Sequence, residues 1–285
     1  MTTQASSRPL HSYWCSCLLL LLVLSALPRH SAAQMTLDGS LGPGGALPGP
    51  NYVIPAGFGQ IRGPNLFHSF GQFNLRAGES ATFTGPGTIE NILSRVTGGS
   101  PSIVDGLIRS QIPGANFYLL NPSGVLFGPN ARLDVSGSFH MSTADYLRLA
   151  DGAAFATHLA LPSILSVSPP EAFGFLAPTP APIGIVGSTL LVPQGERLSV
   201  VGGDIAVTGN APLTSRGIPT LGAPGGRLHL MSVASPGEVS IDPSGQDTTA
   251  PLSVLARLGQ LAITANALLS ADGNGAGTVV IRGGR

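Results

Sequence analysis

The chain has 285 residues, of which 43% are hydrophobic and only 10% are charged, and it contains 39 Gly and 25 Pro. Every basic residue is Arg, and after the first 33 residues 12 Arg remain against 14 acidic residues, a net charge of about −2. This balance argues against a nucleic-acid-binding protein, which needs a basic face, and the apolar runs between the glycines argue against a disordered chain.

The first 33 residues have the features of a secretory signal peptide. Arg8 gives a weakly basic start, residues 17–27 are an apolar stretch, and Ser31-Ala32-Ala33 is a small-residue cleavage site before Gln34. The apolar stretch is too short to cross a bilayer, so a membrane anchor is the weaker alternative. Both cysteines lie in this segment, so the mature chain, residues 34–285, is expected to have no disulfide and no thiolate metal site.

The mature chain begins with a Gly- and Pro-rich stretch, residues 34–50, which we expect to be extended. From Tyr52 onward the sequence predicts short strands that alternate apolar with small or polar residues and end at turn residues. They cover residues 80–84, 89–93, 117–120, 125–127, 133–135, 183–186, 189–192, 197–201, 204–208, 226–230, 238–241, 259–264 and 277–281. Residues 142–149 follow a Ser/Thr cap and are expected to form one short helical turn. Residues 159–182 are richer in Pro and Phe and are expected to leave the regular pattern.

Short strands with Gly-rich corners fit two architectures, a parallel β-helix and an antiparallel sandwich. In a β-helix the strands would turn one common face inward. The side chains expected on that face are Leu198, Val200, Ile205, Val207, Leu228, Leu230, Leu261 and Ile263. The strand pattern alone leaves both architectures open.

Residues 116–150 carry the most informative pattern, three short apolar runs between the turns Asn121-Pro122-Ser123-Gly124, Gly128-Pro129-Asn130 and Ser136-Gly137. With residues 65–70, 73–74, 91–99 and 165–175, this segment resembles the N-terminal secretion domain of the filamentous haemagglutinin family, the exported partner in two-partner secretion. The resemblance covers roughly residues 35–240. It departs from the family at Ser123, where the family's turn is Asn-Pro-Asn-Gly, and there is no clear second Asn-Pro-Asn-Leu motif.

The resemblance implies an all-β fold, a right-handed parallel β-helix with an N-terminal cap and extra-helical strands, over residues 34–285. No capping element is visible before Arg285, so we expect the domain to be truncated at the C-terminus. The resemblance also implies that the chain is recognised by an outer-membrane β-barrel transporter with periplasmic recognition modules. The domain would then lead an adhesin- or haemagglutinin-like β-helix to the cell surface, as a monomer.

Two groups of residues are candidates for transporter recognition or for a cap over the coil. The first group is Asn65, Phe67, His68, Phe70, Phe73 and Asn74, in which a Phe recurs every third residue. These aromatic side chains either cap the coil or, if exposed, contact a partner, and His68 is expected to be a hydrogen-bonded structural residue. The second group is the turn Asn121, Pro122, Ser123 and Gly124, in which Pro fixes φ, Gly permits the reversal and Asn caps a neighbouring amide. The family's equivalent turn is important for secretion.

The sequence indicates no catalytic, metal or cofactor site. His68, His140, His158 and His229 do not have metal-ligand spacing, and the acidic residues, including Asp145 and Glu171, are scattered and expected to be solvated. Residues 272–275 resemble half a calcium loop but lack the following Glu, which favours a plain corner. Two alternatives to the secretion domain remain: a cell-surface adhesin or carbohydrate-binding solenoid that binds a glycan or cell receptor, and, more weakly, a β-helix polysaccharide-degrading enzyme.

Overall fold

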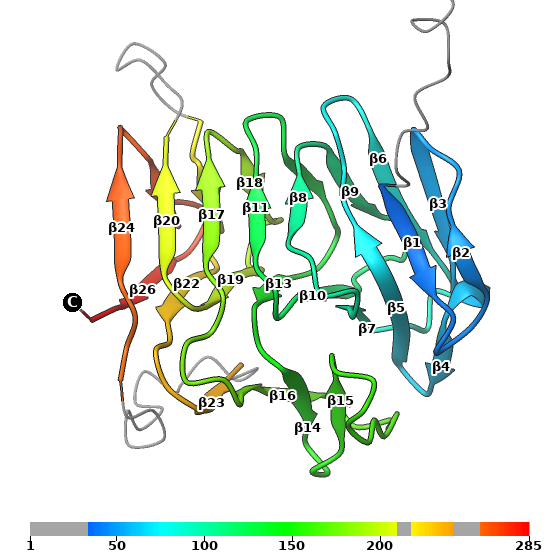
Figure 1. Cartoon of the computed structure of the whole chain (residues 1–285). Helices are drawn as coiled ribbons and strands as arrows, with labels where there is room; N and C mark the ends of the chain where they lie inside the picture. Colours follow the sequence, from blue (N-terminus) through cyan, green and yellow to red (C-terminus); the bar gives the residue numbers. More distant parts are fainter. Residues whose placement is uncertain (1–33, 210–217, 242–256, 285) are drawn as a thin grey trace, which may run out of the picture. The chain divides into compact units, whose positions relative to one another are not determined.

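The computed structural model describes residues 34–209, 218–241 and 257–284 (Figure 1). The predicted signal peptide, residues 1–33, lies outside the described residues. Within them the chain forms short strands and one 3-10 turn, Ala56–Phe58 (η1), and successive coils pair in parallel along three faces. The prediction of an all-β parallel β-helix with extra-helical strands is confirmed, while its right-handed sense and the cap stay predictions.

The first face of the coil is sheet A, in which the same position of each coil lies over that of the last. Leu66 pairs with Ile92, and Ile92 pairs with Phe117. The parallel strands follow in the order β5 (Asn65–Phe73), β7 (Asn91–Val96), β10 (Asn116–Leu120), β13 (Phe139–Ser142), β19 (Arg197–Gly202), β22 (Arg227–Ser232) and β26 (Thr278–Arg282). The free edge of β5 is covered by antiparallel strands, namely β4 (Gln60–Arg62) and β1 (Met35–Asp38), and β1 in turn pairs with β2 (Gly44–Ala46).

The other two faces are built in the same way. Sheet C contains β8 (Ser102–Val104), β11 (Val125–Phe127), β17 (Ile183–Val186), β20 (Ile205–Thr208) and β24 (Leu261–Thr264). Sheet B contains β3 (Asn51–Pro55), β6 (Ser80–Thr84), β9 (Leu107–Ser110) and β12 (Arg132–Asp134). A bridge between Arg132 and Thr189 continues this face into sheet E, which contains β18 (Leu190–Leu191), β21 (Leu221–Gly222) and β25 (Leu269–Ser270).

The interior of the coil is filled by the inward side chains of all three faces. The predicted inward residues Leu198, Val200, Ile205, Val207, Leu228 and Leu230 are fully buried. Leu261 and Ile263 are partly exposed, because β24 is the last strand of sheet C. Aromatic rings pack against one another inside the coil, edge-to-face for Phe83 and Phe117 with centroids 4.7 Å apart, and stacked for Phe117 and Phe139 with centroids 5.7 Å apart. The predicted alternation therefore describes the core correctly.

An antiparallel sheet, called sheet D, lies outside the coil. Its strands are, in order, β15 (Ala154–Ala156), β14 (Tyr146–Leu149), β16 (Pro170–Phe175) and β23 (Gly237–Ser240). It projects below the coils in Figure 1. Its apolar side chains, among them Leu147, Phe155 and Phe173, form a second core with Phe67 and Leu93 of sheet A. Sheet A is thus covered on both faces.

Three sequence predictions about the strands and turns are wrong. Residues 142–149 are not helical, because Leu147 and Leu149 alternate with partly exposed neighbours and form β14. The strand expected in the coil at 238–241 is β23, which pairs with β16 in sheet D. The excursion from the coil begins after β13, which ends at Ser142, and not at residue 159.

Candidate functional site

The turn 121–124 forms the corner between β10 in sheet A and β11 in sheet C. Asn121 is fully buried, and its Nδ2 donates to the carbonyl oxygen of Ser100 at 3.0 Å and to Oγ of Ser102 at 2.9 Å. Its Oδ1 accepts a hydrogen bond from the backbone N–H of Ser123 at 2.9 Å. Gly124 has φ of +111°, a conformation that side-chain-bearing residues rarely adopt. The predicted capping by Asn121 is therefore present, and it ties this corner to the coil below.

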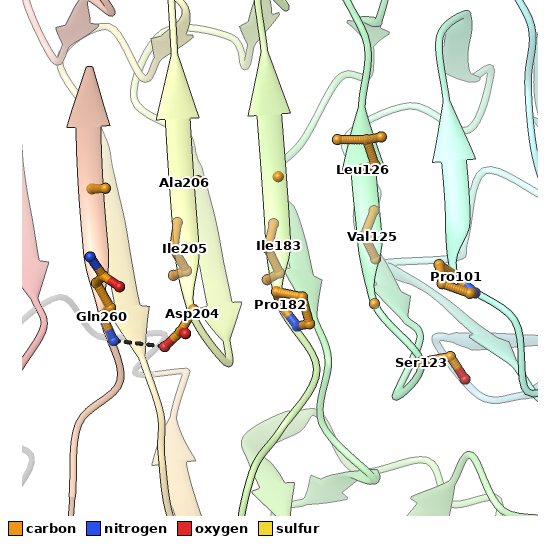
Figure 2. Close-up of a pocket in the computed structure, with 13 residues that line it drawn as sticks. Pro101, Ser123, Val125, Leu126, Pro182, Ile183, Asp204, Ile205, Ala206 and Gln260 are labelled. Atoms are coloured by element: carbon orange, nitrogen blue, oxygen red, sulfur yellow. Dashed lines mark hydrogen bonds between the residues drawn. The ribbon is translucent and has the colours of Figure 1, made fainter.

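One wall of a shallow hollow is formed by the same turn. The hollow has a volume of about 480 Å³ and lies across the outer face of sheet C. Figure 2 shows Ser123 and Pro101 at one end and Asp204 and Gln260 at the other, where the backbone N–H of Gln260 donates to Asp204 at 2.8 Å. Its lining is mostly apolar, and it includes Leu126, which is 40% exposed. This surface is therefore mostly apolar and presents few groups that could form hydrogen bonds.

The first candidate group lies on or directly after β5. The Phe side chains at 67, 70 and 73 are all buried, Phe70 and Phe73 inside the coil and Phe67 in the second core. The alternative that these rings are exposed to a partner is therefore wrong for the folded chain. Asn74 is different, because its Oδ1 accepts from the backbone N–H of Ile103 at 2.8 Å at the surface.

His68 is fully buried between the rings of Phe70 and Phe83, and neither of its ring nitrogens has a hydrogen-bond partner. The expectation that it is a hydrogen-bonded residue is wrong. Burial of the ring lowers its pKa to about 3. Ser94, its register partner on β7, is also buried, and its Oγ has no partner either.

An asparagine ladder begins at Asn65, and the sequence analysis did not detect it. Nδ2 of Asn116 donates to Oδ1 of Asn91 at 3.3 Å, and Nδ2 of Asn91 donates to Oδ1 of Asn65 at 2.9 Å. Nδ2 of Asn65 donates in turn to the carbonyl oxygens of Ser166 and Ser168. The recurrence of Asn at intervals of 26 and 25 residues was the available signal. This ladder joins three coils to the segment before β16.

Asp38 and Arg95 organise a second polar cluster that the sequence analysis also missed. The Asp38 carboxylate accepts hydrogen bonds from Ser40, Ser69 and Thr97, and Arg95 donates to Oγ of Ser69 and Ser40. Burial alone would raise the pKa of Asp38, but these hydrogen bonds together hold it below its ordinary value. Burial lowers the pKa of Arg95, and the Asp38 carboxylate opposes that effect.

The comparison with protein families agrees with this geometry. A model of the TPS secretion domain matches residues 33–281. The chain belongs to this family. The TPS domain is the N-terminal two-partner-secretion domain of exoproteins like filamentous haemagglutinin, so the predicted resemblance is confirmed. The comparison with curated proteins gave no match.

Membership of the TPS family settles the broad function. TPS-domain proteins are secreted through the outer membrane to the cell surface or the medium, and a partner outer-membrane transporter recognises them. The family consists of secretion domains and is not an enzyme family. The described residues hold no group of three or more His, Cys, Asp or Glu side chains that could bind a metal ion. In that same part of the chain, no helix has the length and hydropathy to cross a membrane.

The acidic side chains of the TPS domain are structural where they are buried. Asp145, which was expected to be solvated, is buried and accepts hydrogen bonds from the backbone N–H groups of Leu176 and Ala177. His158 lies 3.0 Å from the same carboxylate. Glu171, which was also expected to be solvated, has a side chain that is 42% exposed but forms an ion pair with Arg148, and Arg148 also pairs with Glu238 at 2.9 Å. These contacts hold sheet D together.

Proposed function

We propose that the transporter's periplasmic modules bind the strand segment 65–74 while it is extended, before the domain folds. The observation that supports this is the enclosure of most of β5. Its residues from Asn65 to Phe70 are buried on both faces, one edge pairs with β7, and the other pairs with β4 and β1. From Asn65 to Phe70 the side chains are therefore buried and the strand is paired on both edges in the folded domain. An extended β5 could instead add to a sheet edge of the transporter through main-chain hydrogen bonds.

In this proposal, folding of the domain follows binding and releases segment 65–74 from the transporter. Pairing of β5 with β4, β1 and β7 would displace it from the transporter, and each further coil buries apolar area against the last. In this proposal the turn 121–124 acts through folding, because Asn121 and Gly124 are buried and only Pro122 and Ser123 are partly exposed. The domain leads an adhesin- or haemagglutinin-like β-helix to the cell surface as a monomer.

The test is capture of the mature chain by the purified periplasmic modules of its transporter. Chain diluted from urea directly onto the modules should be captured, and chain allowed to fold first should not be. Phe67→Ala should weaken capture, whereas Phe139→Ala, a change at an equally buried Phe of sheet A, should not. Equal binding of the prefolded chain would overturn the proposal, and equal effects of the two variants would exclude segment 65–74 as the bound segment.

The alternative role, a carbohydrate-binding solenoid, has less support. Sugar rings commonly pack on exposed aromatic side chains, which offer large apolar faces. Among the described aromatic residues, only Phe58 and Tyr146 are not buried, and both are half-buried. A glycan or cell receptor would therefore have to bind without an aromatic platform on this part of the chain.

A further inference from the structure

We propose that residues 143–175, here called the latch, control when the first coils of the β-helix close. The latch contains β14, β15 and β16 and follows the first coils in the sequence. In this proposal β5 and β7 become stable only after the latch has docked on the outer face of sheet A. Its importance for export rests on the proposed function, but the latch is a property of the chain alone and can be tested without a transporter.

The outer face of the first coils is apolar and is covered by the latch. Phe67 of β5, Leu93 of β7 and Tyr118 of β10 follow one another in register. All three are buried in the second core with latch side chains such as Phe155, whose ring lies 5.0 Å from that of Phe67 in an edge-to-face arrangement. Without the latch these side chains would face water, which removes much of the apolar burial that stabilises the first coils.

The hydrogen bonds of Arg95 also depend on the latch. Its Nη1 donates to two latch groups, the carbonyl oxygen of Ala156 and Oγ of Ser163. Its guanidinium also lies 4.6 Å from the ring centroid of Phe155. The remaining contacts of Arg95 are to Ser69 on β5 and Ser40 near β1. One buried cation therefore joins the N-terminal strands, the first two coils and the latch.

The asparagine ladder is completed by the latch as well. The end amide of Asn65 finds its two acceptors, the carbonyl oxygens of Ser166 and Ser168, at distances of 2.9 and 2.7 Å. These partners lie 101 and 103 residues further along the chain. Until they dock, the fully buried Asn65 lacks both acceptors for its Nδ2.

The order of these contacts along the chain has a consequence for export. Phe67, Arg95 and Asn65 of the first coils each take latch partners that follow by more than 60 residues, such as Ala156, which is 61 residues from Arg95. Stepwise folding from the N-terminus would leave these groups without partners, so the first coils close with the latch and not before it. A chain in which the latch is undocked would keep β5 extended for the transporter.

Hydrogen exchange on the mature chain, residues 34–285, tests the latch. Phe155→Leu should raise the exchange rates of β5 and β7 amides about tenfold more than those of β20, because the latch opens locally. Phe127→Leu, the same change at an equally buried ring on β11, should raise all rates evenly. During refolding, pulse labelling should protect β5 and β7 in the same phase as β14 and β16.

Two outcomes would overturn the latch. One is protection of β5 and β7 in an earlier phase than β14 and β16. The other is faster exchange at β14 in Phe155→Leu with unchanged rates at β5. If Phe155→Leu does not fold, Ser163→Ala removes the hydroxyl that accepts from Arg95 and from the backbone N–H of Ala156, and it should produce the same pattern with a smaller amplitude.

Discussion

Replacing Asn121 with Ala should destabilise the domain by about 3 kcal/mol. The side chain is fully buried and makes hydrogen bonds to Ser100, Ser102 and Ser123 at 2.9 to 3.0 Å. Each bond contributes about 1 kcal/mol, and the buried Ser102 Oγ would lose a partner, which adds to the cost of the change. The loss should come mainly from the folded state, because the bonds to Ser100 and Ser102, 21 and 19 residues away in the chain, require the corner between sheets A and C.

The assay is urea unfolding of the mature chain, followed by circular dichroism. A purely folded-state effect lowers the midpoint and leaves the slope of free energy against urea unchanged. The matched control is Asn130→Ala at the next turn, where the exposed Asn130 side chain makes one hydrogen bond, to Asp105 at 3.0 Å. Its expected cost is below about 1 kcal/mol.

The reasoning fails if Asn121→Ala and Asn130→Ala differ by less than about 1 kcal/mol, because burial would then add nothing to the cost of the lost bonds. It also fails if the slope changes, since the substitution would then be acting on the unfolded chain. A large loss of stability together with normal capture of the unfolded chain by the transporter modules would assign the turn to folding and not to recognition.

Two further predictions concern stability. Burial lowers the pKa of three histidines, to about 3 for His68 and His140 and to about 4 for His229. As pH falls below about 6.5, these histidines therefore take up protons in the unfolded chain before they do in the folded domain. Each histidine then lowers the free energy of unfolding by about 1.4 kcal/mol per pH unit. Urea unfolding between pH 6.5 and 4 should show this slope, and His68→Leu should reduce it by about one third; an unchanged slope would contradict the burial argument. Gly174→Ala should cost about 1–3 kcal/mol, because its Cβ would lie 1.9 Å from Cζ of Tyr146. In thermal unfolding, adding Tyr146→Ala should recover part of that loss, and strict additivity would count against the clash.

The strands of the coil were predictable because their pattern is local. Residues 80–84, 125–127 and 183–186 were predicted with the bounds that β6, β11 and β17 have in the structure. Alternation also identified the inward face. It could not assign a strand to its sheet, because β23 alternates like a coil strand and yet pairs with β16 outside the coil. Pairing partners are set by tertiary contacts and not by the period of a single strand.

The helical turn predicted after Ser142 failed for a related reason. The Ser142 hydroxyl does accept a hydrogen bond from the backbone N–H of Ala144 at 3.1 Å, the kind of contact a helix cap makes. The following residues then continue as β14, because Leu147 and Leu149 are buried against sheet A. A local signal was correct here, and packing against a distant segment decided what followed it.

The candidate site was only partly predictable, since its residues are linked by contacts between distant positions. Asn65 and Asn121 were identified by motif, and both are buried hydrogen-bonding residues. Asp38 lies outside the segments that carry the resemblance. Arg95 lies within one of them but was not a candidate, and the partners of the two residues range from residue 40 to residue 163. The asparagine ladder was accessible in principle, because a repeat of the same polar residue at the coil period indicates stacked side chains.

Burial of the proposed recognition segment, residues 65–74, affects every experiment on it. A substitution in segment 65–74 removes packing from the folded domain and changes the extended segment at the same time, so loss of export alone cannot separate the two effects. Phe67 and Phe139 are both fully buried in sheet A, and truncation to Ala should cost each about 3–5 kcal/mol. If their stabilities fall equally, a difference in capture by the transporter modules measures recognition of the extended chain directly.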